Sequence, residues 1–423
     1  MKVKLTIEPG AFAKALTVLD KIVQDKSALP LLGDVLLTYD KERDEFALTG
    51  SDGESWLTLD CVTVTTDDEG GIVRTRYINL IEPDQKDPLT AVCIPFRQLK
   101  EAVACLPKAL MLQVWLEAPA ANEAGKMRMN YGIGELEMPY DSALEYPTAI
   151  DINEDALRCR FAIDCGVLLP AMKMARVCCA NDELRPVMNT ECIDVFHDHL
   201  VIVASDGHAM TRRQFDLGMG YLQQSNFPAI DPQTGNALSA KLLVPKNVLS
   251  TIDQAFSASA TVTIASDFQR VSFTAEGVRL VARMIDGNYP NYESVIPKDN
   301  NHTVILAVAS LQGALRRLRL SANESSNMVT VTRQQNELIL EAADYDLSRS
   351  GNERVAIQNA IDCSLPDGYQ VGFKISTLAT LLGCVPTENC YLLLSEPNVS
   401  VLMKPEDAKQ NLTLLLTPMI INQ

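Results

Sequence analysis

Apolar residues near the N-terminus recur at helical spacing and then give way to alternating apolar and polar residues. The helical stripe consists of Phe12, Leu16, Leu19 and Val23. Such a stripe is typical of an amphipathic helix with one buried face, whereas strict alternation is typical of a half-buried strand. The strands of this first unit are expected at 29–37, 45–53, 56–59 and 134–139. A second helix is expected to open at 94–97 and to end at Leu106-Pro107.

The same order of elements recurs twice along the chain. The helices of the second copy are expected at about 164–180 and from Val244-Pro245-Lys246 to Phe256. Those of the third copy are expected at about 309–322 and from the 373–376 segment to Pro386. Recurring order at a fixed period indicates internal repeats, which have to be recognised before any fold is assigned.

Short motifs mark equivalent places in these copies. Ser51-Asp52-Gly53 and Ser205-Asp206-Gly207 follow corresponding strands, and Ala343-Asp344 follows the corresponding strand of the third copy. The sequence therefore predicts an α+β protein of three tandem units, each with two helices packed on antiparallel sheets. The expected domains are 1–155, 156–300 and 301–423. Tandem units of similar shape usually close into an arc, a ring or an array.

Charge is distributed unevenly between the helices and the rest of the chain. The chain has 37 Lys and Arg against 54 Asp and Glu, a formal net charge of −17. The predicted helices alone carry an excess of about eight positive charges. Their cations are Lys14, Lys21, Lys26, Arg97, Lys100, Lys108, Lys173, Arg176, Lys246, Arg316, Arg317, Arg319 and Lys374. Lys and Arg are common on solvated helix faces of many proteins. The concentration of cations on the helices of an acidic chain is what favours a functional role for them.

A ring with its helices turned inward would have a positive bore and a negative rim. Duplex DNA carries about one negative charge per 1.7 Å of axis, so the bore would attract it. Contacts of this kind read phosphates instead of base edges, and they therefore permit sliding. A sequence-specific DNA-binding or scaffold protein is the second class considered. It would need a recognition helix aimed at base edges or a concentrated basic patch, and neither is evident in the sequence.

Composition excludes several other classes of protein. The hydrophobic fraction of 47% with 22% charged residues is ordinary for a globular chain. The N-terminal residues alternate like those of a strand and do not resemble a secretory signal. The sequence has no run of about 18 apolar residues, so no membrane span is expected. The eleven cysteines include no Cys-x-x-Cys pair and are expected to be reduced core thiols. We therefore expect a cytoplasmic protein.

Residue types found in catalytic and metal sites occur in unsuitable arrangements. Ser205, Asp206 and His208 are almost adjacent on one strand and turn, so they cannot easily form the relay of a hydrolase triad. His197 and His199 lack an evident third metal ligand, and a solvated hairpin tip is expected there. Gly132-Ile133-Gly134 lacks the third glycine of a dinucleotide loop. Neither an enzyme nor a cofactor is expected.

The sequence resembles those of a known family, the β sliding clamps of bacterial DNA polymerase III. The resemblance covers essentially the whole chain. The stretches that carry it are Leu29-Pro30-Leu31-Leu32-Gly33, Ser205-Asp206-Gly207-His208, Asp286-Gly287-Asn288-Tyr289-Pro290-Asn291-Tyr292, Ser321-Ala322-Asn323-Glu324 and Thr417-Pro418-Met419. It implies a non-catalytic, head-to-tail homodimer of six domains that encircles double-stranded DNA without sequence preference. It also implies partners: a clamp loader, the replicative polymerase that the ring tethers, and other proteins with a clamp-binding motif.

The resemblance also implies site residues. The DNA-binding candidates, which combine the helix charges with two positions of the family, are Lys14, Lys21, Lys26, Arg97, Lys100, Lys173, Arg176, Arg185, Lys246, Arg316 and Arg317. The expected wall of a peptide-binding cleft comprises Met188, Ser205, Gly207, His208, Met210, Pro290, Val295, Leu415, Thr417, Pro418 and Met419. The expected dimer interface sets Leu136 and Met138 of one subunit against the Leu320 region of another. Ala209, Ile420 and Pro186-Val187 depart from the family pattern.

Overall fold

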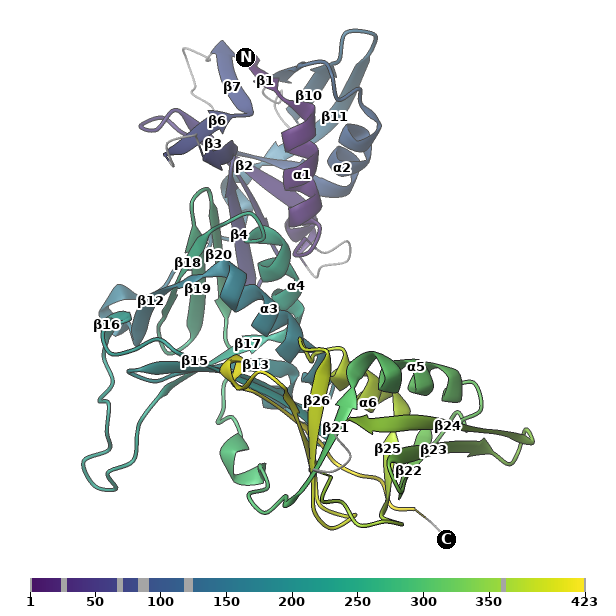
Figure 1. The fold of residues 1–423 in the computed structure, drawn as a ribbon. Helices are drawn as coiled ribbons and strands as arrows, with labels where there is room; N and C mark the ends of the chain where they lie inside the picture. The colour runs from purple at the N-terminus through teal and green to yellow at the C-terminus, as the bar shows by residue number, and fades with distance from the viewer. Residues whose placement is uncertain are drawn as a thin grey trace. The chain divides into compact units, whose positions relative to one another are not determined.

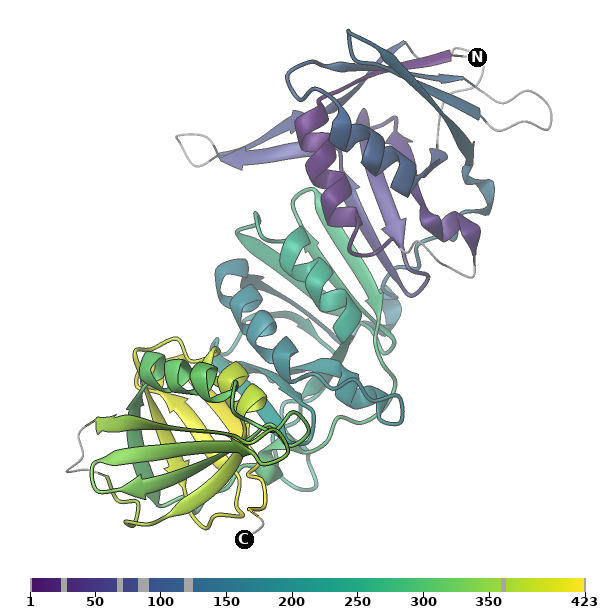
Figure 2. The same ribbon diagram turned by 90° about the vertical axis from the view of Figure 1, so that its right-hand side faces the viewer.

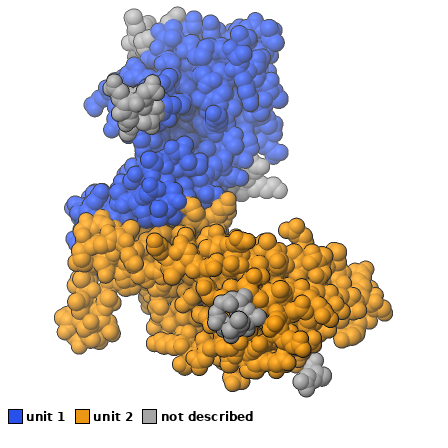
Figure 3. All heavy atoms as spheres, viewed as in Figure 1, with its two compact units in different colours: residues 1–169, 222–227, 247–284 blue, residues 170–221, 228–246, 285–423 orange. Residues whose placement is uncertain are grey.

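A computed structural model describes residues 2–23, 29–66, 71–82, 91–117, 125–358 and 363–421. The chain divides into two compact units (Figure 3). Unit 1 comprises Met1–Leu169, Leu222–Phe227 and Asn247–Met284. Unit 2 comprises Pro170–Tyr221, Pro228–Lys246 and Ile285–Gln423. The two units divide the middle one of the three expected domains between them, and the three-domain division stays a prediction.

Unit 1 is built on antiparallel strands (Figure 1). Their order in the sheet is β16 (Leu222–Ser225), β12 (Cys159–Asp164), β18 (Thr261–Ser266), β19 (Arg270–Ala275), β20 (Val278–Arg283), β4 (Ser55–Asp60), β3 (Glu45–Ser51), β2 (Asp34–Asp40), β8 (Ala91–Pro95), β11 (Glu135–Ser142), β10 (Gly125–Asn130), β9 (Leu112–Glu117), β1 (Lys2–Ile7) and β7 (Ile78–Glu82). A separate hairpin pairs β5 (Val62–Thr66) with β6 (Ile72–Arg76). Both strands are rich in β-branched residues, which favour extended structure.

The helices α1 (Pro9–Leu19) and α2 (Phe96–Cys105) lie side by side in unit 1 (Figure 2). Helix α1 begins at Pro9 because the Glu8 carboxylate accepts the backbone N–H groups of Gly10 and Ala11, at 2.8 and 2.6 Å. The segment after α1 packs closely on β3 at Gly50, where a Cβ atom would lie 2.7 Å from Val23 Cγ2. Glycine is therefore needed at this position of the strand.

Unit 2 is built on a second set of antiparallel strands. Their order is β17 (Ala240–Pro245), β13 (Thr190–Val195), β14 (His199–Ser205), β15 (Ala209–Asp216), β28 (Leu412–Leu416), β27 (Val401–Pro405), β26 (Asn389–Leu394), β21 (His302–Ala307), β24 (Arg349–Gln358), β23 (Glu337–Asp344), β22 (Met328–Gln334) and β25 (Gln370–Lys374). Helices α5 (Val308–Leu318) and α6 (Ile375–Leu382) pack against each other (Figure 2). Each buries an apolar stripe, as the periodicity predicts.

Two more helices complete the set that the sequence predicts, α3 (Cys165–Ala175) and α4 (Lys246–Ala255). The expected helix at 164–180 is shorter, because the chain tightens into a 3₁₀ turn at Arg176–Cys178 after Ala175. Pro170 lies inside the helix and does not end it. The expected helix at 309–322 ends at Leu318, where the chain turns through Arg319. The α+β fold class and the six predicted helices are confirmed. The strand expected at 29–37 begins only at Asp34, because Pro30 opens a 3₁₀ turn over Pro30–Gly33.

Candidate functional sites

The cations predicted to face DNA differ in how far their charge is balanced. Lys14 lies on α1, Lys21 follows it, Lys173 lies on α3 and Arg316 on α5; all four side chains are exposed. Within the described parts of the chain, none of the four forms an ion pair. Their charge is therefore free to meet phosphate. Arg176 is half-buried in the turn after α3.

Other predicted cations are held by carboxylates. Lys100 Nζ lies 2.7 Å from Asp20 Oδ1, and Arg97 Nε lies 3.2 Å from Glu101 Oε1. Arg185 Nε lies 2.7 Å from Asp182 Oδ2. The Arg317 guanidinium donates to both oxygens of Glu353, at 2.7 and 2.9 Å. A bidentate pair of this kind leaves little of the guanidinium for another anion. Contact with Glu353 also raises the pKa of Arg317 and lowers that of Glu353.

Two further predicted cations, Lys246 and Lys26, belong to neither of these groups. Lys246 Nζ donates to the Cys179 carbonyl and to Asn181 Oδ1, both at 3.0 Å, so it ties the start of α4 to the loop after α3. Lys26 lies outside the described residues. The sequence located the positive helices but could not separate free from paired cations, because the carboxylates that pair with them, such as Glu353, can lie on other elements.

The segments predicted to form a peptide-binding cleft gather within unit 2. Met210 and Leu415 are opposite each other in the β15–β28 ladder, where they belong to one buried apolar cluster with Tyr289 and Tyr292. Val187 packs against the same cluster. The predicted sequence segments around 186–188, 205–210, 289–296 and 415–419 therefore meet at one place.

Their residues take different parts in this site. Met188 and Met210 are 7% and 1% exposed, so their side chains are part of the core at this place. Pro290, Gly207 and His208 are exposed and Val295 is 57% exposed. Half-buried positions lie between these extremes: Ser205, Thr417, Pro418 and Met419. The surface that a partner could touch is therefore the rim of this cleft.

The Ser205-Asp206-Gly207 turn is shaped by its own side chains. Asp206 Oδ1 accepts the N–H groups of His208 and Ala209 at 2.8 and 2.7 Å, and Ser205 Oγ donates to the Ala209 carbonyl. Gly207 has φ +91°, which favours glycine. The serine and aspartate are thus engaged in the turn, which leaves no relay to His208. The reading of this motif as structural, and not catalytic, agrees with this geometry.

A buried polar contact fixes the linker that carries Tyr292. The Tyr292 hydroxyl donates to Asp194 Oδ2 at 2.7 Å, and Lys241 Nζ lies 5.5 Å from the centre of the Tyr292 ring. Burial and the neighbouring Asp194 raise the pKa of Tyr292, so the phenol remains protonated. The Tyr-Pro-Asn-Tyr stretch contributes to the family resemblance, but the sequence did not assign these tyrosines to the site. Two tyrosines within a short, otherwise polar linker are the signal that could have done so.

Close packing at Gly287 and one ion pair also hold this linker. A Cβ atom at Gly287, where φ is +136°, would lie 2.7 Å from Val187 Cγ1. Arg212 Nε lies 2.7 Å from Glu293 Oε1. Glu191, on the neighbouring strand, is fully buried, and its oxygens have no hydrogen-bond partner among the described residues. Burial raises the pKa of Glu191 far above its ordinary value, with Arg176 acting in the opposite direction.

Each unit has a strand with one open edge. In unit 1, β11 pairs with β10 over Glu135–Tyr140 but with β8 only at Asp141 and Ser142. In unit 2, β24 pairs with β23 over Arg349–Ala356 but with β21 only at its end. Within the described residues, these edges carry unpaired backbone groups that another strand can complete.

The predicted interface residues lie at or beside these edges. Leu136 on β11 is 36% exposed, whereas Met138 is 7% exposed and packs within its own unit. Leu320 is 76% exposed just after α5. The end of α5 lies against β24, since a Cβ atom at Gly351 would be 3.3 Å from Leu318 Cδ2.

Other sequence features were also located. His199 Nδ1 lies 2.6 Å from Asp198 Oδ1, and its ring stacks on Phe196 at the hairpin. Within the described residues, no group of three or more His, Cys, Asp or Glu could hold a metal ion. The cysteines are free thiols, mostly buried. In the described part of the chain, no helix is long and apolar enough to cross a membrane.

The sequence is similar to those of known proteins. Residues 293–419 match the family described as "DNA polymerase III beta subunit, C-terminal domain". The beta sliding clamp of Pseudomonas aeruginosa is 22% identical over 402 residues, which are 95% of this chain and 96% of the relative. The chain resembles the beta sliding clamps over its whole length. The clamp of Caulobacter vibrioides is also 22% identical over 402 residues, covering 93% of this chain and 94% of the relative.

Solved sliding-clamp structures share the fold. A DNA polymerase sliding clamp from Bacillus subtilis has a TM-score of 0.81 at 18% identity and full coverage of both chains. A Pseudomonas aeruginosa sliding clamp bound to griselimycin has a TM-score of 0.81 at 20% identity, also with full coverage of both chains. All of these relatives are named as sliding clamps.

Proposed function

We propose that the protein is a DNA sliding clamp that encircles duplex DNA and tethers a replicative polymerase. Its active form is a head-to-tail homodimer with the three domains 1–155, 156–300 and 301–423 in each subunit. The observation that carries this proposal is the match of the whole chain to solved sliding clamps, at a TM-score of 0.81. A clamp loader opens the ring, and the ring itself performs no chemistry.

The two open strand edges support the dimer. Because β11 and β24 belong to different units of one chain, one subunit can offer β11 where the next offers β24. Strand addition then continues the sheet from one subunit into the other. Leu136 and Leu320 add exposed apolar surface beside the two edges. An interface of this head-to-tail type closes only when the rotation between subunits completes a circle.

The unpaired helix cations support the contact with DNA. Lys14, Lys21, Lys173 and Arg316 project charge from α1, α3 and α5 or from the turn after α1. These side chains can approach phosphates without fixing a base sequence, so the ring can slide. The paired cations Lys100 and Arg97 strengthen the local field less, since carboxylates offset their charge.

The cleft of unit 2 is proposed to dock partner peptides that end in apolar residues. The core at this place contains methionine and tyrosine, and thioether side chains adapt to several ligands. Polymerase, loader and other proteins with a clamp-binding motif are the expected occupants. Ile420, which is 86% exposed, gives the rim an apolar residue where other clamps differ, whereas Ala209 is buried.

Retention on DNA of different topology tests the function. The protein is loaded on nicked circular DNA with a clamp loader, and the circle is then cut by a restriction enzyme. A ring should stay on the closed circle and leave the linear product by sliding off its ends. A sequence-specific DNA-binding protein would remain on both. Sedimentation at micromolar concentration should first give a mass near twice 46.4 kDa, and a monomer at all concentrations would contradict the ring.

A further inference from the structure

A second groove lies wholly within unit 1 and is lined by residues that have no assigned role above. It has a volume of about 570 Å³. One wall is the start of the Pro30–Gly33 turn, with Leu29, Pro30 and Leu31. The other wall is the end of β11 and the segment just after it, with Leu144 and two carboxylates, Asp141 and Glu145. Leu144 is 94% exposed and Leu29 is 56% exposed, so apolar side chains stand open to solvent here.

The groove repeats the local structure of the cleft in unit 2. In each case a 3₁₀ turn opens with proline and buries one large side chain, Leu32 at 3% exposure and Met188 at 7%. In each case a later segment of the same unit supplies a Tyr-Pro pair whose tyrosine is buried, Tyr146 in unit 1 and Tyr289 in unit 2. A proline-led turn and a Tyr-Pro segment thus occur in both units.

The third shared part is the turn at Gly53, which corresponds to the turn at Gly207. The two glycines have φ +93° and +91°. The N–H of each donates to the serine two residues before it, at 2.9 Å to Ser51 Oγ and 3.1 Å to Ser205 Oγ. A Cβ atom at Gly53 would lie 3.2 Å from Leu32 Cδ1, so the turn packs on the same buried side chain that lies under the groove.

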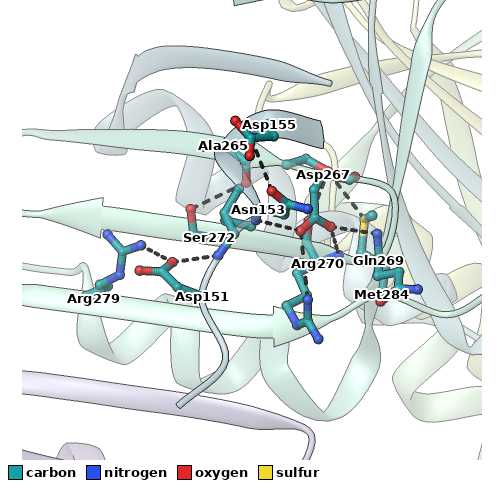
Figure 4. Close-up of polar contacts among 12 residues, drawn as sticks. Asp151, Asn153, Asp155, Ala265, Asp267, Gln269, Arg270, Ser272, Arg279 and Met284 are labelled. Carbon is teal, nitrogen blue, oxygen red and sulfur yellow. Dashed lines mark hydrogen bonds and ion pairs between the residues drawn. The ribbon is translucent and has the colours of Figure 1, made fainter. Parts of the chain in front are cut away.

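The linker that forms one wall is held in place farther along. Asn153 N donates to Asp267 Oδ2 at 3.0 Å, and Asp267 Oδ1 also accepts the N–H groups of Gln269 and Arg270 (Figure 4). Asp151 is bound by Arg279 in the same view. Since both ends of the segment are fixed by β11 and by this network, the wall is formed before any ligand arrives. Preformed sites lose less entropy on binding.

The two grooves differ in charge. The unit 2 cleft has His208 on its rim, and Arg185 beside it is paired with Asp182, whereas the unit 1 groove has Asp141 and Glu145. Both carboxylates are exposed, and neither forms an ion pair with any described residue. Asp34, buried nearby, has its pKa raised to about 6 by burial and by Asp141, which indicates a local excess of negative charge. A ligand that brings a positive charge would relieve it.

We propose that the unit 1 groove is a second docking site, which binds a short partner peptide carrying apolar side chains next to Lys or Arg. The apolar side chains would cover Leu144 and Leu29, and the cation would lie beside Asp141 and Glu145. This specificity complements that of the unit 2 cleft, so one subunit could hold two different partners at once. The site goes beyond the proposed clamp function, and it can bind its peptide whether or not the chain closes into a ring.

Fluorescence anisotropy with two labelled pentapeptides tests the site on the full chain. The first probe has the sequence Lys-Leu-Leu-Lys-Arg, and the second has Glu-Leu-Leu-Glu-Asp. The first should bind and the second should not. The affinity for the first should also fall as salt is raised, because exposed charges are screened. Equal binding of both probes, or no binding of the basic probe up to millimolar concentration, would overturn the assignment.

Matched variants locate the bound peptide. Leu144→Ser should weaken binding on the order of tenfold, because a buried leucine contributes about 1.5–3 kcal/mol. Asp141→Asn with Glu145→Gln should weaken it on the order of fivefold at low salt, as expected for two exposed ion pairs. Leu184→Ser is the control, since Leu184 is 92% exposed beside the corresponding turn of unit 2. Weaker binding to Leu184→Ser with unchanged binding to Leu144→Ser would place the peptide in unit 2 and refute this site. Retention on circular DNA should be unchanged in all variants, which separates this test from that of the clamp function.

Discussion

Leu320 offers the sharpest test of how subunits join. Its side chain is 76% exposed in the single chain, directly after α5 and next to the open edge of β24. Fully burying a leucine contributes about 1.5–3 kcal/mol, so burial of the exposed part should contribute about 2 kcal/mol at one junction. A closed dimer has two equivalent junctions by symmetry. Leu320→Ser should therefore weaken dimerisation by about 4 kcal/mol, close to a thousandfold in the dissociation constant.

Sedimentation velocity over nanomolar to micromolar concentrations measures this change directly. The matched control is Met219→Ser, because Met219 is 78% exposed and lies on a loop of the same unit. The control should dimerise like the unchanged protein. Neither substitution removes a buried contact, so the free energy of unfolding should change by less than about 0.5 kcal/mol in both. An unchanged dissociation constant for Leu320→Ser, or an equal loss in the control, would refute the placement of the junction beside β24.

Three further predictions concern DNA contact and stability. Reversing Lys14, Lys21 and Lys173 to Glu should shorten retention on closed circular DNA, whereas reversing the exposed Lys41, Lys298 and Lys409, which lie outside the α-helices, should not. Equal effects would mean that only net charge matters. Tyr292→Phe should lower the free energy of unfolding by about 1.5–3 kcal/mol in urea, because it removes the 2.7 Å hydrogen bond to buried Asp194. Tyr345→Phe, at a 91% exposed tyrosine, should change nothing, and equal stabilities of both variants would contradict that role. Asp34, whose pKa rises from 3.8 to about 6, binds its proton more tightly in the folded state, so its contribution to stability falls as pH rises from about 4 to about 6. Asp34→Asn should remove up to about 3 kcal/mol of that fall, and an unchanged pH profile of unfolding would count against the burial of its charge.

The fold could be predicted largely from local patterns. The stripe of Phe12, Leu16 and Leu19 specifies one buried helix face, and the repeated Ser-Asp-Gly motif specifies a turn whose hydrogen bonds are all local. Such features depend on residues only a few positions apart, so the sequence contains them. The ends of α3 were less predictable, because Pro170 is tolerated inside the helix.

The candidate site depends on distant residues and was therefore predicted only in part. Met210 meets Leu415 across the β15–β28 ladder, and this pairing is decided by the register of two strands far apart in sequence. The balance of charge at Arg317 depends on Glu353 in the same way. Only the resemblance to a family placed such residues together beforehand. The acidic groove of unit 1 was missed because its carboxylates are unremarkable until the fold brings them beside Leu144.

The open edges of β11 and β24 also determine what the chain does when closure fails. Two different edges on one molecule allow each added copy to present a fresh edge to the next. Growth then stops only if the second copy meets the first, and otherwise it continues as a filament. A substitution that changes the curvature of the chain without touching either edge should therefore produce polymers and not monomers. Closure into the proposed ring would thus also protect both edges from pairing with further copies.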